Sequence, residues 1–278
     1  MTTMTITAAD INKLRQMTGA GMMDCKKALT EAEGDFEKAI DELRKKGQKV
    51  AANRSDRDSK EGFVLAKVTS DNKRGVVLAV NCETDFVSKN ADYGKMVNNI
   101  LDIAIAKNPK SADELKALAY DNNITIADKL IEQTGVIGEK IELTKFGVIE
   151  APFVYAYNHP GNQLANIVGF SSDSVNADVA KDVSMQVAAM APVAVDKGDV
   201  DAETIQREIE VGKEQARAEG KAEEMLEKIA MGKLNKFYKE STLLNQEFIK
   251  DNKKSISQYL NDSEKGLTVT GFNRIALG

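Results

Sequence analysis

The sequence contains few of the residue types that build reactive sites. Its 278 residues include two cysteines, one histidine and no tryptophan. A single histidine, His159, excludes a histidine-rich metal site. Cys25 and Cys82 are isolated and lack C-x-x-C spacing, which is typical of reduced thiols in a cytoplasmic protein rather than of a disulfide framework. We therefore predict no metal ion and no cofactor.

Long hydrophobic runs and an excess of basic charge are also missing. No apolar run approaches the roughly 18 residues of a membrane-spanning helix, and the opening "MTTMTITAADINKLRQ" lacks the apolar core of a signal peptide. The formal net charge is −5, whereas contact with nucleic-acid phosphates requires a basic surface. We expect a cytoplasmic protein that binds neither membranes nor nucleic acid.

The first fifty residues have the pattern of three short helices. Thr7 is placed to cap the first, and "TGAG" at 18–21 breaks it. Gly34 closes the second helix, whereas Asp35 caps the third and Gly47 ends it. At helical spacing, the residues expected to face inward are Ile11, Leu14, Met17, Met22, Cys25, Ala28, Leu29, Phe36, Ala39, Ile40 and Leu43. The pattern predicts a compact docking module rather than a ligand pocket.

An internal repeat follows the charged stretch at 49–62, in which we place a linker over residues 53–62. Each copy has two strand-like runs and a helix, and each helix starts at the letters "NAD", at 90–92 and at 176–178. The predicted elements are strands at 62–68 and 75–81 with a helix at about 91–106, then strands at 152–158 and 166–172 with a helix at about 176–190. We predict an α+β fold in which antiparallel strand pairs are backed by helices.

Residues 201–240 are mostly polar with a thin apolar seam, which indicates two helices folded back at Gly220. The seam residues are Ile205, Ile209, Leu226, Ile229 or Ala230, and Phe237. A seam this narrow suits pairing of the two helices with each other or with another chain, so self-association through the hairpin is possible. Before the hairpin, "ITIADKLIEQTGVIGEKIEL" predicts a helix and a strand with a break at Gly135 and Gly138. After it, a short helix near "SISQYL" and a strand in "LTVTGFNRIAL" complete the chain.

No complete catalytic set is present. Cys82 and His159 could form a nucleophilic pair, although a cysteine after an apolar strand is more often a half-buried small residue. Glu83 and Asp85 could face one cation, although solvated turn acids account for them as well. No phosphate-binding glycine motif occurs. A hydrolase that uses Cys82 stays open as an alternative to a protein without covalent chemistry.

Phe86 is the unusual residue in "NCETDFVSKN", residues 81–90. It directly follows a strand and lies among charged residues, where burial in its own chain is not obvious. One interpretation is that it folds back onto the following helix. The other is that it anchors a protein partner, as exposed aromatic side chains often do.

Three segments resemble the elongation factor Ts family, the nucleotide exchange factors of elongation factor Tu: "LRQMTGAGMMDCKKALTEAEGDFEKAI", "VNCETDFVSKN" and "VTGFNRIALG". The resemblance implies a three-helix domain like the ubiquitin-associated (UBA) domains at 1–52. It implies core subdomain 1 at 63–140, core subdomain 2 at 141–186 and 238–278, and a protruding coiled-coil hairpin at 187–237. The three-helix unit taken alone would also fit an adaptor of the ubiquitin-binding type.

The resemblance also implies a function and a set of contact residues. A guanine nucleotide exchange factor binds elongation factor Tu with GDP and promotes GDP release without covalent chemistry. Four residues, Thr84, Asp85, Phe86 and Val87, would enter the partner near its magnesium site. Further expected contacts are Lys26, His159, Leu164, Ala165, Gln186 and Ile249.

Two features depart from the family pattern. Gln186 stands where some relatives carry histidine in "MHVAA", so an imidazole contact there is replaced by an amide or absent. The chain ends at Gly278, soon after "GFNR", whereas some relatives continue into a C-terminal helix that docks on the partner. We expect the contacts between that helix and the partner to be missing.

Overall fold

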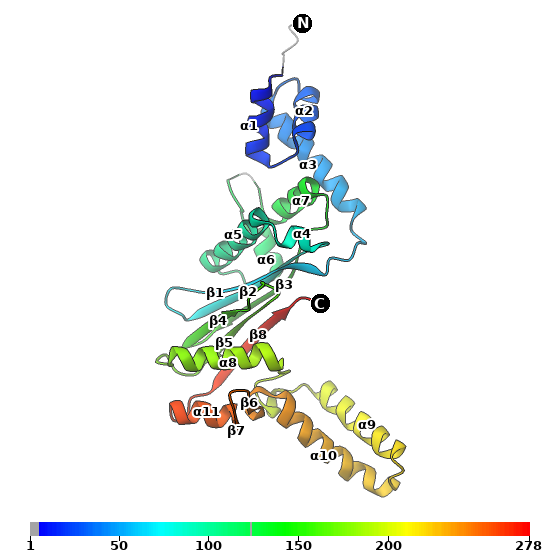
Figure 1. Cartoon of the computed structure of the whole chain (residues 1–278), viewed down its shortest axis with the longest axis vertical. Coiled ribbons are helices and arrows are strands. Elements are labelled where there is room, and N and C mark those ends of the chain that lie inside the picture. Colours follow the sequence, from blue (N-terminus) through cyan, green and yellow to red (C-terminus); the bar gives the residue numbers. More distant parts are fainter. Residues whose placement is uncertain (1–5, 123) are drawn as a thin grey trace. The chain divides into compact units, whose positions relative to one another are not determined.

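A computed structural model of the chain describes residues 6–122 and 124–278 (Figure 1). The chain divides into two compact units. The first contains the residues up to Val64, Leu78–Phe146 and the last two residues, and the second contains Leu65–Val77 and Gly147–Ala276. Helices and strands occur in both, and the three-stranded sheet of the second unit is antiparallel, so the predicted α+β class is confirmed.

The first unit begins with three helices, α1 (Ala8–Thr18), α2 (Met22–Glu31) and α3 (Phe36–Asn53). Thr7 and Asp10 form a capping box at the start of α1, and the Asp35 side chain accepts two backbone N–H groups at the start of α3. Both caps satisfy donors that a helix leaves unpaired at its first turn. The apolar cluster between the helices contains Leu14, Ala20, Cys25, Ala28, Leu29, Ala32 and Ala39. The predicted three helices are confirmed.

Two methionines and one glycine differ from the prediction. Met17 and Met22 were expected inside, but their exposed fractions are 56% and 50%. They flank the 18–21 turn and lie outside the apolar cluster between the three helices. Gly47 does not end α3, which continues to Asn53.

Gly47 instead allows α3 to approach α7 (Ile126–Ile137) very closely. A Cβ at Gly47 would lie 3.1 Å from the carbonyl oxygen of Ile131, and a Cβ at Gly135 would lie 2.5 Å from the Cα of Gly47. Gly135 therefore lies inside α7 rather than breaking it, and the helix ends at Gly138, whose φ of 82° favours glycine. Two glycines thus join the three-helix module to α7 by backbone contact.

A three-stranded sheet has the order β1-β2-β3, formed by β1 (Glu61–Val68), β2 (Arg74–Cys82) and β3 (Glu142–Glu150). Every residue of β2 is buried. In the first unit α5 (Ala91–Lys107) packs against the end of β2, and the buried Tyr93 hydroxyl donates to the Val80 carbonyl at 2.8 Å. The short helices α4 (Asp85–Ser88) and α6 (Ala112–Ala117) precede and follow α5.

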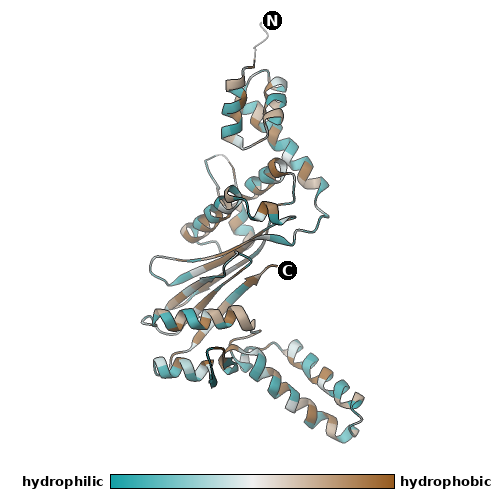
Figure 2. Cartoon of the chain, viewed as in Figure 1, coloured by the Kyte–Doolittle hydropathy of each residue, from teal (hydrophilic) through white to brown (hydrophobic). Residues whose placement is uncertain are grey.

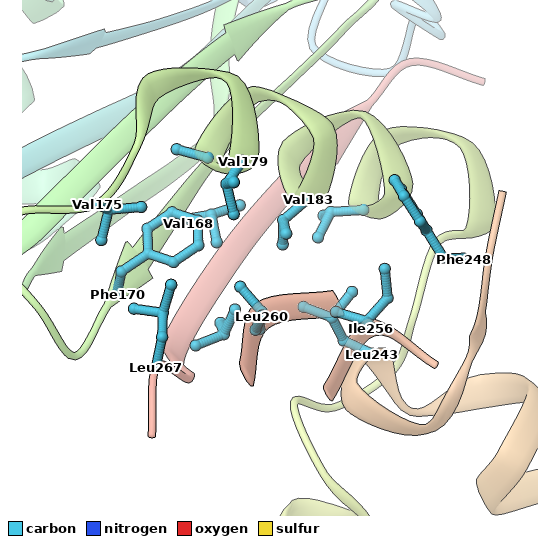
Figure 3. Packing of buried hydrophobic residues seen from close by; sticks show 13 residues of the cluster. Val168, Phe170, Val175, Val179, Val183, Leu243, Phe248, Ile256, Leu260 and Leu267 are labelled. Carbon is cyan, nitrogen blue, oxygen red and sulfur yellow. The ribbon is translucent and has the colours of Figure 1, made fainter. Parts of the chain in front are cut away.

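The second unit is built on the antiparallel sheet β4-β5-β8, formed by β4 (Phe153–Asn158), β5 (Leu164–Phe170) and β8 (Val269–Ala276). In its central register Val168 of β5 lies opposite Tyr155 and Phe272. Figure 3 shows side chains of α8 (Ala177–Met190) and α11 (Ile256–Ser263) pointing toward one another across the core. Its labelled residues are Val168, Phe170, Val175, Val179, Val183, Leu243, Phe248, Ile256, Leu260 and Leu267.

The two strands and the helix predicted for each copy are present, although the short α4 lies between β2 and α5 in the first copy. The caps match as well: the side-chain oxygen of Asn90 accepts from the Asp92 amide, and that of Asn176 accepts from the Asp178 amide, each at 2.8 Å. β3 lies beyond the expected subdomain boundary at residue 140, yet it belongs to the sheet of β1 and β2 because it pairs with β2. The five expected segment boundaries stay a prediction.

The helical hairpin is formed by α9 (Ala202–Ala218) and α10 (Glu223–Ser241), with Gly220 in the left-handed region at the turn. Hydrophilic and hydrophobic residues alternate along both helices (Figure 2). The side chains buried along the seam are Ala216, Leu226, Ala230 and Leu234, and Gly212 allows the helices to approach at Ala230. Of the predicted seam, Leu226 and Ala230 are buried, whereas Ile205, Ile209 and Phe237 are half-buried.

Short elements connect these parts. They are η1 (Lys197–Asp199) before the hairpin, and η2 (Leu243–Asn245), β6 (Glu247–Phe248) and β7 (Asp251–Ser255) after it. β6 and β7 pair antiparallel, and Phe248 stacks on Tyr259 of α11 with ring centroids 4.2 Å apart. The turn between these strands is therefore fixed on the second unit's core.

We predict that Gly135→Ala destabilises the protein, because its Cβ would overlap the backbone of Gly47. Overpacking of this kind costs about 1–3 kcal/mol of the free energy of unfolding, measurable by urea denaturation. Gly232→Ala in α10 is the control, since its Cβ meets nothing within 4 Å. It should stabilise by about 0.5–1 kcal/mol through helix propensity. Equal effects at both positions would contradict the close contact of α3 and α7.

Candidate functional site

The candidate site is the turn that follows β2, which we call the 84–87 turn (Thr84, Asp85, Phe86 and Val87). The chain passes from the buried Cys82 to Phe86, whose side chain is 85% exposed. No other large hydrophobic residue that the structure describes is as exposed. The interpretation in which Phe86 folds back onto the following helix is therefore wrong. The aromatic ring is available to a partner.

The backbone at the start of this turn is held by Glu139, which follows the end of α7. One carboxylate oxygen accepts the amides of Glu83 and Thr84 at 3.1 and 3.0 Å, and the other accepts the Thr84 hydroxyl at 2.6 Å. Hydrogen bonds to a charged acceptor contribute about 1.5–3 kcal/mol each. The turn is thus fixed at its base by a residue distant in the sequence.

Glu83 makes a second set of charged contacts beside the first. Its carboxylate accepts from Arg54 Nη1 at 2.8 and 2.9 Å and from the Lys140 amide at 2.7 Å. Burial alone raises the pKa of the Glu83 carboxyl, but the hydrogen bonds from Lys140 and Arg54 outweigh it, so the net pKa is lowered. Glu83 is therefore neither a solvated turn acid nor a cation ligand. It joins the end of β2 to the C-terminal end of α3.

Asp85 points into solvent and pairs with Lys89, with 2.7 Å between Oδ2 and Nζ. The hydrogen bond from Lys89 lowers the pKa of the Asp85 carboxyl, which is ionised at neutral pH. An exposed i,i+4 pair of this kind is weak and is screened by salt. The carboxylate can consequently exchange Lys89 for another cation or face a partner's negative charge.

A groove of about 930 Å³ lies beside Phe86 in the first unit. Its walls come from the C-terminal end of α1, from α4 and α5, and from α7. Apolar atoms of Met17, Val87 and Val136 alternate there with polar groups such as Gln133 and Lys129. Such a mixed lining fits an amphipathic surface of another protein better than a small apolar ligand.

The cysteine and histidine considered for catalysis each have another contact. Cys82 is fully buried, its thiol donates to the Thr84 carbonyl at 3.2 Å, and burial raises its pKa to about 11. His159 Nδ1 lies 3.0 Å from the Tyr157 hydroxyl. At neutral pH Cys82 is a protonated thiol, which is a poor nucleophile. Within the described residues there is also no cluster of three or more histidine, cysteine or acidic side chains that could hold a metal ion.

The other predicted contact residues differ widely in exposure. Lys26 and His159 are exposed, Leu164 is half-buried, and Ile249 is 45% exposed in the turn between β6 and β7. Ala165 is fully buried because it lies in β5, the central strand of its sheet. A direct contact from its side chain is therefore not available on this surface.

Gln186 is also fully buried, in contrast to the expected surface contact. Its amide nitrogen donates to the side-chain oxygen of Gln246 and to the Glu247 carbonyl, both at 3.1 Å, and its oxygen accepts the Ile249 amide at 3.0 Å. The amide is thus used within the chain. It holds the turn that exposes Ile249.

Comparison with known proteins gives one consistent result. The sequence model of the family described as elongation factor TS matches residues 83–278. An elongation factor Ts from Christiangramia forsetii is 56% identical over 98% of this chain and 99% of its own length. Those from Cytophaga hutchinsonii and Flavobacterium psychrophilum are each 54% identical, over 98% and 99% of this chain respectively and 99% of their own lengths.

The chain belongs to the elongation factor Ts family. It is therefore grouped with translation elongation factors, as the sequence motifs predicted. Among the residues that the structure describes, no helix is both long and apolar enough to cross a membrane.

Sequence patterns located the 84–87 turn but not the residues that hold it. Glu139, Arg54 and Lys140 lie between 29 and 57 positions from their partners, which are Thr84 for Glu139 and Glu83 for the other two. Each lies at or just beyond the C-terminal end of a helix, where basic residues such as Arg54 and Lys140 are common because the helix dipole favours them. Their positions at helix ends therefore do not distinguish these three residues from other polar residues in the sequence.

We predict that the contribution of Glu83 to stability depends on pH. Because its folded-state pKa is lowered, the contribution is complete above the ordinary glutamate pKa of about 4.3 and declines as pH falls through the folded-state value. Glu83→Gln should reduce the free energy of unfolding by on the order of 1 kcal/mol at pH 7. The difference from wild type should shrink at pH 3.5, as measured by urea denaturation.

Asp58→Asn serves as the control, because Asp58 forms only an exposed ion pair with Lys60 at 3.4 Å. It should change stability little at either pH. A gap between wild type and Glu83→Gln that widens on acidification would contradict the lowered pKa.

Proposed function

We propose that this protein is a guanine nucleotide exchange factor that binds elongation factor Tu in its GDP form and promotes GDP release, so that GTP can bind. The observation that carries the proposal is Phe86, an 85% exposed aromatic side chain on a turn fixed at its base. Family membership supplies the partner class. The function needs no covalent chemistry, cofactor or nucleic acid, and its place is the cytoplasm.

The proposed action of the 84–87 turn is to disturb the partner's nucleotide site. A phenyl ring inserted between elements of the nucleotide-binding domain shifts the backbone that holds the phosphates and the magnesium ligands. A carboxylate brought near a phosphate adds like-charge repulsion. Thr84 and Val87 flank this pair and contact the same surface. Both effects weaken nucleotide binding.

Exchange then follows from linkage alone. The factor binds the nucleotide-free partner more tightly than the loaded one, and the nucleotide weakens factor binding by the same ratio. A coupling of about 4 kcal/mol corresponds to roughly a thousandfold change in affinity. No bond in GDP has to break.

Further contacts give the complex its stability. We assign the three-helix module, with Lys26, to the partner's nucleotide-binding domain. We assign the region of His159, Leu164 and the Ile249 turn to a distal domain of the partner. Ala165 and Gln186 support that surface from inside, since both are buried. The helical hairpin is left for self-association or other contacts.

Phe86→Ala should slow stimulated GDP release about thirtyfold, because an aromatic anchor contributes about 2 kcal/mol or more. The measurement is stopped-flow release of a fluorescent GDP from elongation factor Tu. Asp85→Asn should have a smaller effect, since its charge is solvated and screened.

Met225→Ala is the matched control, because Met225 is a 49% exposed apolar side chain on α10, remote in sequence from the turn. With this variant, elongation factor Tu should release GDP at the rate seen with the wild-type protein. If the intact chain does not accelerate release, the proposal is wrong. If Asp85→Asn abolishes acceleration and Phe86→Ala leaves it unchanged, the ranking of the two residues is wrong.

A further inference from the structure

We propose that Glu139 is a positioning residue for Phe86: it fixes the backbone from which the aromatic ring projects, and exchange depends on it through Phe86 alone. The inference rests on the proposed function. Glu139 lies outside the 84–87 turn and 53 positions from Phe86 in the sequence. It acts on the turn only through the amides of Glu83 and Thr84 and the Thr84 hydroxyl.

The turn cannot hold its own geometry. α4 has four residues, and its N-cap residue, Thr84, makes no side-chain cap hydrogen bond. Its closing hydrogen bonds run from the Ser88 amide to the Thr84 carbonyl at 3.3 Å and from the Lys89 amide to the Asp85 carbonyl at 3.0 Å. A single helical turn is unstable by itself, because nucleation orders several residues for very few hydrogen bonds. The geometry must be imposed from outside.

Glu139 is suited to impose it. A carboxylate has acceptor sites on both oxygens, and here one oxygen takes two adjacent amides while the other takes the hydroxyl. Three contacts to two consecutive residues define both the position and the direction in which the chain leaves β2. The Thr84 hydroxyl donates its proton to Glu139 and makes no cap hydrogen bond to α4.

The residue that positions the turn is itself held in place. The next residue, Lys140, donates its amide to Glu83 at 2.7 Å and its side-chain nitrogen to the Ser55 carbonyl at 3.0 Å. The contacts are therefore reciprocal between residues 83–84 and residues 139–140: Glu139 binds the backbone of Glu83, and Glu83 binds the backbone of Lys140. Each segment restrains the other, so a displacement of Glu139 would move the turn with it.

Rigidity matters to exchange because Phe86 is exposed before the partner binds. An exposed side chain on a mobile loop loses conformational entropy when it becomes ordered in a complex, and that loss weakens binding. A turn held in one geometry avoids most of the loss. Glu139 thus raises the strength of the Phe86 contact without touching the partner.

Two substitutions separate the hydrogen bonds from the mere presence of a side chain. Glu139→Ala removes all three acceptor contacts and should slow stimulated GDP release about tenfold, a smaller loss than removal of the anchor itself. Glu139→Gln should restore most of the rate. Its carbonyl oxygen can accept both amides while its NH₂ group donates to the Thr84 hydroxyl oxygen.

A double-mutant cycle tests whether Glu139 acts through Phe86. In the Phe86→Ala background, Glu139→Ala should produce no further slowing, because the side chain that it positions is already absent. A purely structural role would instead give the same fold-change in both backgrounds. Independent, multiplicative effects of the two substitutions would overturn the inference.

Asp128→Ala is the matched control. Asp128 accepts the amide of Thr125 at 3.2 Å and its hydroxyl at 2.7 Å, the same donor types that Glu139 accepts from Thr84, but at the start of α7. It should leave the rate of stimulated release at the wild-type value. A rate loss equal to that of Glu139→Ala would show that any broken cap in this unit slows exchange, and would overturn the positioning role.

Amide hydrogen exchange of the free protein tests the physical contact without the partner. Glu139→Ala should accelerate exchange at Glu83 and Thr84 about tenfold or more while leaving Thr125 unchanged, since only the contacted amides lose their acceptor. Unchanged protection at Glu83 and Thr84 would overturn the contact. If the intact chain fails to accelerate GDP release, the proposed function fails and the functional role of Glu139 fails with it, whereas the protection result stands separately.

Discussion

The end of β2 imposes the main constraint on the first unit. Every residue of β2 is buried, and four positions after its last residue, Cys82, the chain reaches the exposed Phe86. Backbone amides at such a boundary have left the strand ladder and still need acceptors. Glu139 supplies them, and its own placement requires α7 to end at Gly138. The module packed on α7 through Gly47 is therefore part of the same arrangement.

Three acidic residues beside this boundary differ in what surrounds them. Glu83 is held by Arg54 and a backbone amide, Glu139 by amides and a hydroxyl, and Asp85 by a solvated lysine. The first two are structural because their lone pairs are used by groups of the same chain. The Asp85 side chain is the more exposed, at 48% against 16% for Glu83, and its one partner is a solvated lysine. Environment, rather than residue type, thus separates the carboxylate proposed to act from those that support it.

Local patterns predicted the elements of the fold well. The letters "NAD" marked two helix starts, and in both the asparagine is the cap, because capping depends on residues only two or three positions apart. Glycine was harder to interpret. Gly138 and Gly220 end or turn helices as expected, whereas Gly47 and Gly135 lie inside helices because another backbone lies against them. That reason is tertiary, and no local pattern contains it.

Part of the candidate site could be predicted from the sequence and part could not. Phe86 stood out because an aromatic residue among charges after a strand is unusual, while Glu139 and Gln186 gave no comparable signal. Both act on backbone groups far away in the sequence, and Gln186 was expected at the surface although the interior of the second unit uses its amide. An exposed residue can be recognised in a sequence when its type is unusual for its surroundings, as with Phe86. Residues that hold such a residue in place are visible only once the chain is folded.

The thiol of Cys82 is buried just before the 84–87 turn, and this burial affects its reaction with oxidants. Thiolates that solvent can reach attack peroxides and disulfides, and Cys82 offers neither an exposed sulfur nor an ionised one at neutral pH. Cys82, the cysteine just before the 84–87 turn, is therefore protected from oxidation. Oxidation of Cys82 would therefore require β2 to open first.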